Sequence, residues 1–213
     1  MLIPKFENEC YNYLKHERGV NFLIHFTLLD NIAGIARHGI IPRSMPDFSI
    51  KTTDDYRIDQ QMEASCFSIS FPNYRMLYSK RNQMPDTQFV ILLFDIDCLN
   101  YIDIDKVAYC AHNAASAEML NLSFAEKTGL NAAKAMFYDE DNIRSNHYLP
   151  SHFTTDPQAE VQIKAIVPFA AVKEIHINST KAEQYITQLG ISGIPIINSE
   201  MFFRPRCDYK YWS

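Results

Sequence analysis

A carboxylate opens a stretch of alternating polar and apolar residues in the last third of the chain. From Glu160 the sequence "EVQIKAIV" places acid, amide and amine on one face and apolar side chains on the other. This period of two predicts a half-buried β-strand over residues 160–167. A carboxylate fixed at the start of a rigid strand suits proton transfer or the stabilisation of developing positive charge. The alternative is a solvated acid paired with Lys164.

Two other side chains carry chemistry of their own. His25 lies within the apolar "LIHFT", a setting typical of a core histidine and also of a ligand-binding one. Arg57 lies in "DDYRID". A guanidinium there can bind a pyrophosphate through two hydrogen bonds. The alternative is an ion pair with one of its acidic neighbours, which are Asp54, Asp55 and Asp59.

Two stretches interleave aromatic and cationic side chains, "NYRMLYSKR" (73–81) and "FFRPRCDYKYW" (202–212). Bases stack on aromatic faces while cations bind phosphates, so both stretches suit single-stranded nucleic acid. The alternative for each is a set of core aromatic rings with solvated charges. The first stretch offers Tyr74, Arg75, Tyr78, Lys80 and Arg81 as nucleic-acid-binding residues. The second offers Arg204, Arg206 and Lys210.

Length and composition limit the classes of protein. With 213 residues, 47% hydrophobic and 21% charged, the chain is expected to form a single globular domain over residues 1–213. The net charge of −5 argues against general attraction to nucleic acid and leaves a local basic groove. Five scattered cysteines and the absence of a secretory signal predict reduced thiols and a cytoplasmic protein. The longest apolar run, residues 89–94, is too short to span a membrane.

Familiar nucleotide and metal motifs are absent. Neither a P-loop nor a G-x-G-x-x-G sequence occurs, so a nucleotide must be held another way. Cys110-x-His112 has no second Cys/His pair at ligand spacing, and we therefore expect no metal site.

Periodicity and turn residues predict the elements that position these groups. Strands early, helices in the middle and strands late indicate an α+β fold. A helix over 28–39 has Asp30 as its expected cap and Gly39 in the C′ position. The other expected helices cover 4–17, 114–137 with a break at Gly129, and 180–189. The expected strands cover 21–27, 65–71, 88–96, 160–167, 173–177, 194–197 and 201–203.

Five segments occur in an order and spacing that resemble the DarT family of bacterial toxins, which attach ADP-ribose from NAD to bases of single-stranded DNA. The segments are "IHFTLLDNIAGIARHGIIPR" (24–43), "DDYRID" (54–59), "SISFPNYRMLY" (68–78), "CAHNAAS" (110–116) and "DPQAEVQIKAIVP" (156–168). The similarity spans residues 20 to about 205. It implies an ADP-ribosyltransferase fold like that of poly(ADP-ribose) polymerases, with two abutting antiparallel sheets flanked by helices around an NAD cleft.

The resemblance also implies roles for residues. Glu160 matches the catalytic glutamate, which holds the ribose and stabilises the oxocarbenium-like transition state. Arg57 matches an arginine needed for activity, and we expect it to bind the NAD pyrophosphate. His25 is expected to donate a hydrogen bond to the adenosine-side ribose, with Phe26 and Thr27 beside it at the nicotinamide.

Further roles concern the ends of the cleft. Asn31 and Gly34 match positions that border the adenosine part of NAD, and Asn113 falls in a loop near the acceptor base. Gln162 departs from arginine-specific transferases, which carry a second acid two residues from the catalytic one.

We therefore predict an NAD-dependent mono-ADP-ribosyltransferase toxin that modifies a nucleobase in single-stranded DNA. NAD is its substrate, and an antitoxin that removes ADP-ribose is its expected partner. An RNA or protein acceptor and a non-catalytic module that binds NAD or ADP-ribose stay open as alternatives. Whether thymine or guanine is modified stays open too.

Overall fold

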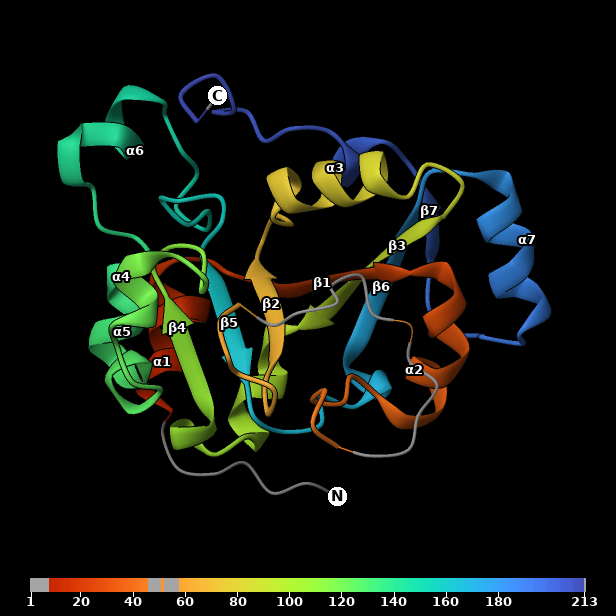
Figure 1. The fold of residues 1–213 in the computed structure, drawn as a ribbon, viewed down its shortest axis with the longest axis horizontal. Helices are drawn as coiled ribbons and strands as arrows, with labels where there is room; N and C mark the ends of the chain where they lie inside the picture. The colour runs from red at the N-terminus through yellow and green to blue at the C-terminus, as the bar shows by residue number, and fades with distance from the viewer. Residues whose placement is uncertain (1–7, 46–50, 52–57, 213) are drawn as a thin grey trace.

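The computed structural model describes residues 8–45, 51 and 58–212 (Figure 1). In this described part, seven strands form one sheet in the order β4-β5-β2-β1-β3-β6-β7. Neighbouring strands are antiparallel except β6 and β7, which are parallel. The strands are β1 Phe22–Leu28, β2 Ser65–Ile69, β3 Phe89–Asp95, β4 Val107–Cys110, β5 Glu160–Ile163, β6 Val172–Ile177 and β7 Ile196–Asn198.

The sheet has two halves that meet at β1 and β2. β1 pairs with β3 along all seven of its residues, but with β2 only at Leu23–Ile69 and Ile24–Ser68. On its other side, β2 pairs with β5. The two halves agree with the two abutting sheets expected from the resemblance, and the α+β class is confirmed. Only the parallel β6–β7 pair departs from an all-antiparallel arrangement. No residue of β1 after Ile24 pairs with β2, so the two strands separate from this residue onward.

Short helices surround the sheet (Figure 1). α5 packs on β4 and α1 packs on α5, while α7 contacts β7 at the opposite edge. α3 contacts the 3-10 turn Met201–Phe203. The helices are α1 Glu9–Asn12, α2 Ile32–His38, α3 Tyr74–Gln83, α4 Ala117–Leu120, α5 Gly129–Ala135, α6 Ile143–Asn146 and α7 Thr180–Gln188. No helix among the described residues is both long and apolar enough to cross a bilayer.

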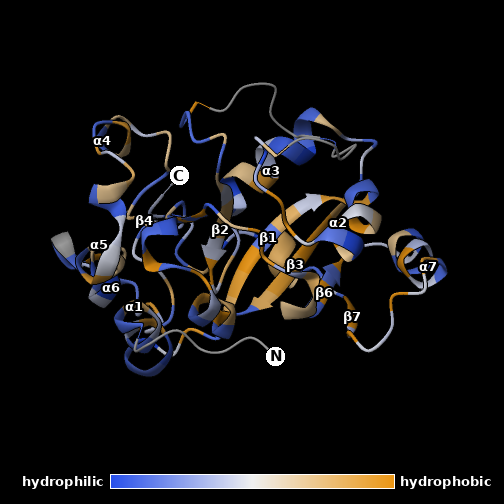
Figure 2. Cartoon of the chain, turned by 90° about the horizontal axis from the view of Figure 1, so that it is seen from below, coloured by the Kyte–Doolittle hydropathy of each residue, from blue (hydrophilic) through white to orange (hydrophobic). Residues whose placement is uncertain are grey.

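The core follows the most apolar run of the sequence. β3 is buried from Phe89 to Phe94, as expected for a central strand between β1 and β6. The hydropathy colouring shows the same continuous apolar centre along β1 and β3 (Figure 2). β3 thus supports β1 along its whole length.

Gly39 ends α2 in the position that the sequence predicted. Its φ of +77° lies in the region that favours glycine, and an added Cβ would lie 2.3 Å from the Val167 carbonyl oxygen. The close approach lets Ile40 form an isolated bridge with Val167. The expected cap, Asp30, is wrong: Asn31 holds the N-cap position, and the Asp30 carboxylate accepts a 2.6 Å bond from the Lys51 ammonium.

Several predicted elements need correction. The strand from Glu160 ends at Ile163, and residues 201–203 form a 3-10 turn because Phe202 and Phe203 pack inward beneath α3. The helical region 114–137 is divided into α4, a 3-10 turn and α5, which begins at Gly129. The helix predicted over 4–17 is described from Glu9, and its last five residues have π-helical hydrogen bonding. β4, α3 and α6 were not predicted.

Candidate active site

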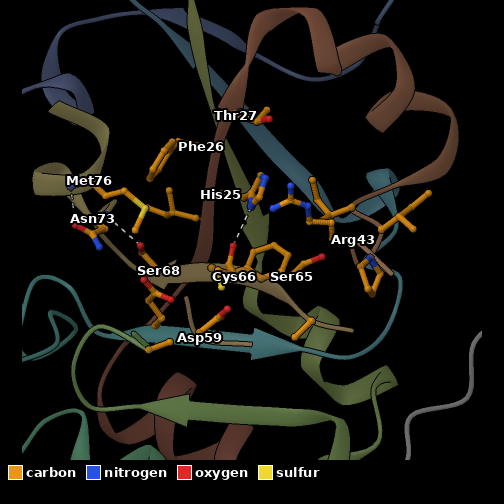
Figure 3. Close-up of a pocket in the computed structure, with 18 of the residues that line it drawn as sticks. His25, Phe26, Thr27, Arg43, Asp59, Ser65, Cys66, Ser68, Asn73 and Met76 are labelled. Carbon is orange, nitrogen blue, oxygen red and sulfur yellow. Dashed lines mark hydrogen bonds between the residues drawn. The ribbon is translucent and has the colours of Figure 1, made fainter. Parts of the chain in front are cut away.

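A cavity of about 500 Å³ opens where β1 and β2 part. This volume lies within the usual range for small-molecule sites. Side chains from β1, β2, the segment after α2 and the start of α3 project into it (Figure 3). Residues on its wall include His25, Phe26, Thr27, Asn31, Arg43, Lys51, Asp59, Ser65, Ser68, Asn73, Met76, Asn113 and Glu160.

Glu160 lies on the cavity wall at the first position of β5, opposite Cys110 of β4. Its side chain is buried, with 6% of the residue exposed, so the alternative of a solvated strand-end acid is wrong. Lys164 instead pairs with Glu63 at 3.5 Å and lies over the Phe124 ring. A carboxylate on a central strand between β4 and β2 is held in a fixed position.

The polar face of β5 is buried, which contradicts the half-buried strand expected from its alternation. Gln162 is fully buried and donates a 2.7 Å hydrogen bond from Nε2 to the Asp59 carboxylate. Asp59 lies on the cavity wall and covers this face. Burial raises the pKa of the neighbouring Cys110 thiol to about 12, so this cysteine is not a thiolate near neutral pH.

A hydrogen bond of His25 defines which of its ring nitrogens carries a proton. Its Nδ1 lies 2.9 Å from the Cys66 carbonyl oxygen, which can only accept, so Nδ1 carries the proton. Burial lowers the pKa of the imidazole from its usual value. In a neutral ring with Nδ1 protonated, Nε2 is an acceptor. The geometry therefore favours accepting a hydrogen bond from a ligand hydroxyl, where the sequence predicted that His25 donates one.

Asn31 joins the wall of the cavity to a distant backbone segment. Its amide donates to the Thr27 hydroxyl at 2.9 Å and to the Lys51 carbonyl at 2.8 Å, and its Oδ1 accepts from the Lys51 N–H. These bonds occupy the Asn31 amide in protein contacts. Gly34 lies on α2 and is not on the cavity wall.

Arg43 brings a cation to the cavity from the segment after α2 (Figure 3). The sequence offered one signal for it, since Arg43 ends the "HGIIPR" segment, but we had not predicted a role for it. Arg57, the arginine that the sequence singled out, lies outside the described residues. Its role stays a prediction.

Two guanidinium groups hold the loop that leads to Glu160. Arg206 donates to the carbonyls of Thr154 and Thr155 at 2.8 and 2.9 Å. Arg144 donates to those of Phe153 and Pro150 at 2.6 and 2.9 Å. These carbonyls would otherwise need other partners, so the two cations fix the approach of the chain to β5. The sequence left Arg206 open as a nucleic-acid-binding cation or a solvated charge, and its burial fits neither alternative.

The predicted nucleic-acid-binding residues of the first stretch have different environments. Tyr78 is 65% exposed and Arg75 is exposed, both on α3. Tyr74 is buried, and burial raises the pKa of its hydroxyl. Arg81 donates to the Phe203 carbonyl at 3.2 Å, and Lys80 lies 3.4 Å from the Gln83 side-chain oxygen. The structure thus leaves Tyr78 and Arg75 as the most accessible of the five.

Asn113 lies on the cavity wall in the turn after β4. Its Oδ1 accepts the Ala115 N–H at 2.8 Å, and its carbonyl accepts the Ser116 N–H. The amide nitrogen can face a ligand while the oxygen holds the turn. Among the residues described, no three His, Cys, Asp or Glu side chains gather at metal-binding distance.

Known structures share this fold. Thermus sp. 2.9 DarT in complex with ADP-ribosylated ssDNA matches with a TM-score of 0.58 and 12% identity over 87% of this chain and 97% of that one. The same DarT with carba-NAD+ matches at 0.56 and 14%, over 86% and 98%. Thermosipho africanus DarTG with ADP-ribose matches at 0.54 and 16%, over 86% of this chain but only 51% of that one. A search of curated proteins finds no match.

These likenesses define the class by fold: the protein has the fold of the DarT structures, and its cavity lies where the two halves of the sheet meet. A family model described as "ssDNA thymidine ADP-ribosyltransferase, DarT" matches residues 24–203, and the chain belongs to this family. The activity of the class follows from membership, namely NAD-dependent transfer of ADP-ribose to single-stranded DNA. The family and activity predicted from the ordered motifs are confirmed.

Proposed function

We propose that this protein transfers one ADP-ribose from NAD to thymine in single-stranded DNA, using the cavity between β1 and β2. The observation that supports it best is the buried carboxylate of Glu160 on the same cavity wall as His25 and Arg43, in a chain of the DarT family. The family description names thymidine, which favours thymine over guanine. The whole chain, residues 1–213, then acts as one transferase domain.

Glu160 supplies the electrostatic part of the reaction. As the bond between the ribose C1′ and nicotinamide breaks, its electron pair leaves with nicotinamide, and positive charge develops on the ribose. A preorganised carboxylate in a buried wall stabilises that charge. The new bond forms between C1′ and a ring nitrogen of the base, whose proton must leave; Glu160 is the proposed acceptor of that proton.

His25 and the arginines orient NAD. The acceptor Nε2 of His25 suits a ribose hydroxyl, and the planar guanidinium of Arg43 suits the pyrophosphate. Phe26 and Thr27, on the part of β1 beyond its pairing with β2, are the proposed neighbours of the nicotinamide. Arg57 is still proposed to bind the pyrophosphate; this proposal rests on the sequence alone.

The acceptor strand is proposed to lie along α3, with Tyr78 and Arg75 facing it and Asn113 near the entering base. We further propose a cytoplasmic location, since the five cysteines form no disulfide, and a partner antitoxin that removes ADP-ribose. An RNA acceptor is the nearest alternative, because an RNA strand offers similar bases and phosphates.

The test is incubation with NAD and matched oligonucleotides, followed by mass spectrometry. We expect an ADP-ribose adduct on single-stranded DNA that contains thymine and little on thymine-free DNA, RNA or duplex DNA, whose bases must first be unpaired. Glu160→Gln should lower transfer by at least ~100-fold while NAD affinity by calorimetry changes far less. An adduct on protein or RNA alone would contradict the proposed acceptor, and NAD binding without any transfer would indicate a non-catalytic module.

A further inference from the structure

We infer that Asn73 is a substrate-binding residue whose side-chain N–H binds a planar carbonyl group at one end of the cavity. The inference rests on the proposed function and deepens it, because both reactants carry such a group. Nicotinamide has a carboxamide oxygen, and thymine has two ring carbonyls.

The side chain of Asn73 is held in one orientation by its own helix. Asn73 is the N-cap of α3, and its Oδ1 accepts the Met76 N–H at 3.1 Å. Its backbone N–H donates to the Ser68 hydroxyl at 3.0 Å. Only the oxygen can accept from Met76, so the amide cannot be flipped and Nδ2 must face the other way.

That nitrogen has no hydrogen-bond partner. Asn73 is 2% exposed, and its Nδ2 is one of four buried side-chain nitrogen or oxygen atoms without a partner in the described part of the chain. Burying an amide N–H without an acceptor is unfavourable, and such groups call for an explanation. Asn73 lies on the wall of the cavity, so a bound ligand can supply the missing acceptor.

The surroundings favour a neutral carbonyl on a planar ring over a phosphate. Phe26 and Met76 line the same end of the cavity, and Figure 3 shows them on the side of Asn73, away from Arg43. An aromatic ring and a thioether suit the faces of a flat heterocycle. The first turn of α3 contains no acid, so the partial positive charge of the helix start also favours an oxygen acceptor here.

Two substitutions separate this role from the capping role. Asn73→Ser keeps a good N-cap oxygen and removes the nitrogen, while Asn73→Asp replaces that nitrogen with an oxygen that repels a carbonyl. We expect the melting temperature of Asn73→Ser to stay within about 2 °C of wild type. Its kcat/KM for transfer should fall by ~10-fold or more, and Asn73→Asp should lose more.

Asn8 provides a matched control. It caps α1 through the Tyr11 N–H, as Asn73 caps α3, but its Nδ2 donates to the Leu99 carbonyl at 3.1 Å. Asn8→Ser should therefore lower the melting temperature by about 2–4 °C and leave kcat/KM within about twofold. The two asparagines should show opposite patterns.

Kinetic constants of Asn73→Ser show whether Asn73 binds the carbonyl of nicotinamide or that of the base. A raised KM for NAD, with weaker NAD binding by calorimetry in the absence of DNA, assigns the nicotinamide carboxamide. A raised KM for the oligonucleotide alone assigns the base. The inference is overturned if the wild type transfers ADP-ribose and Asn73→Ser has the same KM for NAD, the same KM for the oligonucleotide and the same NAD affinity as the wild type. Absence of transfer by the wild type would contradict the proposed function and not this inference. In that case, calorimetry of NAD binding to the wild type and to Asn73→Ser would still test the role of Asn73.

Discussion

α3 and the C-terminal tail, residues 202–212, have similar compositions and opposite environments. Both interleave aromatic rings with Lys and Arg, and by composition both suit a single strand of nucleic acid. On α3, Tyr78 and Arg75 face solvent. In the tail, Arg206 is 2% exposed and forms a buried ion pair with Asp208.

The difference comes from one acid. The stretch 73–83 contains no Asp or Glu, so its cations have no acidic partner on their own helix. In the tail, Asp208 follows Arg206 by two residues and accepts bonds from its Nε and Nη2 at 2.7 and 2.6 Å. Trp212 donates to the same carboxylate. A basic-aromatic stretch with an acid inside it is therefore a weaker sign of nucleic-acid binding than one without.

The largest expected effect is a loss of stability when a cation of the tail is replaced, compared with a cation of α3. Arg206→Met leaves the Asp208 carboxylate buried without its cation and frees the carbonyls of Thr154 and Thr155. We expect the free energy of unfolding to fall by about 3–5 kcal/mol. Arg75→Met, the matched change on α3, should alter it by no more than about 0.5 kcal/mol. Urea unfolding at constant m-value measures both, and equal losses would remove the distinction.

A double variant sharpens the same test. Replacing Arg206 and Asp208 together with Met and Leu removes both charges, so much of the lost stability should return. Transfer should stay reduced, because the loop before Glu160 still lacks its hydrogen bonds. Full recovery of transfer would show that the tail stabilises the fold without positioning Glu160.

Much of the fold was predictable because its strands have strong local signals. β1, β3 and β6 lie within one or two residues of the predicted strands. β4 was missed because its four residues are too few to show a period. α3 was missed because only Tyr74 and Leu77 are buried along its ten residues, which leaves a weak apolar stripe.

The site was only partly predictable. Glu160 begins an alternating stretch and His25 lies among apolar residues, so both could be singled out from the sequence. The structure places both on one cavity wall. Arg43 and Asn73 reach the cavity from a segment after one helix and from the cap of another. Contacts of this kind depend on tertiary packing, which sequence spacing does not encode. The burial of Arg206 against Thr154 and Thr155, some 50 residues away, was hidden for the same reason.

The next largest effect concerns stacking on α3. Tyr78→Ala should weaken binding of a single-stranded oligonucleotide by about 1–3 kcal/mol, the usual value for one stacked base. Tyr78→Phe should retain binding, because the ring and not the hydroxyl stacks. Fluorescence anisotropy at fixed salt measures both. Tyr74 is buried, so an equal loss in Tyr74→Phe would indicate that α3 acts through its packing and not through an exposed ring.

A smaller effect should appear in the salt dependence. Arg75→Gln combined with Lys80→Gln should lower the slope of log affinity against log salt by roughly 0.7 for each phosphate that the variant no longer binds. Tyr78→Ala should leave this slope unchanged, since stacking releases no counterions. Arg81 is left intact because its bond to the Phe203 carbonyl holds α3 to the turn beneath it. An unchanged slope in the double variant would place the phosphates elsewhere.

The smallest effect is expected from the exposed rings of the tail, and it decides whether the two regions really differ. Tyr209 and Tyr211 are both exposed, so exposure alone would allow them to stack on bases. Tyr211, however, already contacts His147 and Trp212, with ring centroids 5.0 Å apart in each case, and Arg206 supplies no cation beside it. We therefore expect Tyr209→Ala and Tyr211→Ala to change oligonucleotide affinity by less than about 0.5 kcal/mol, as for ordinary surface positions. A loss as large as that of Tyr78→Ala, at unchanged melting temperature, would make the tail a second nucleic-acid surface. It would show that the buried Arg206 positions the exposed rings of the tail for binding.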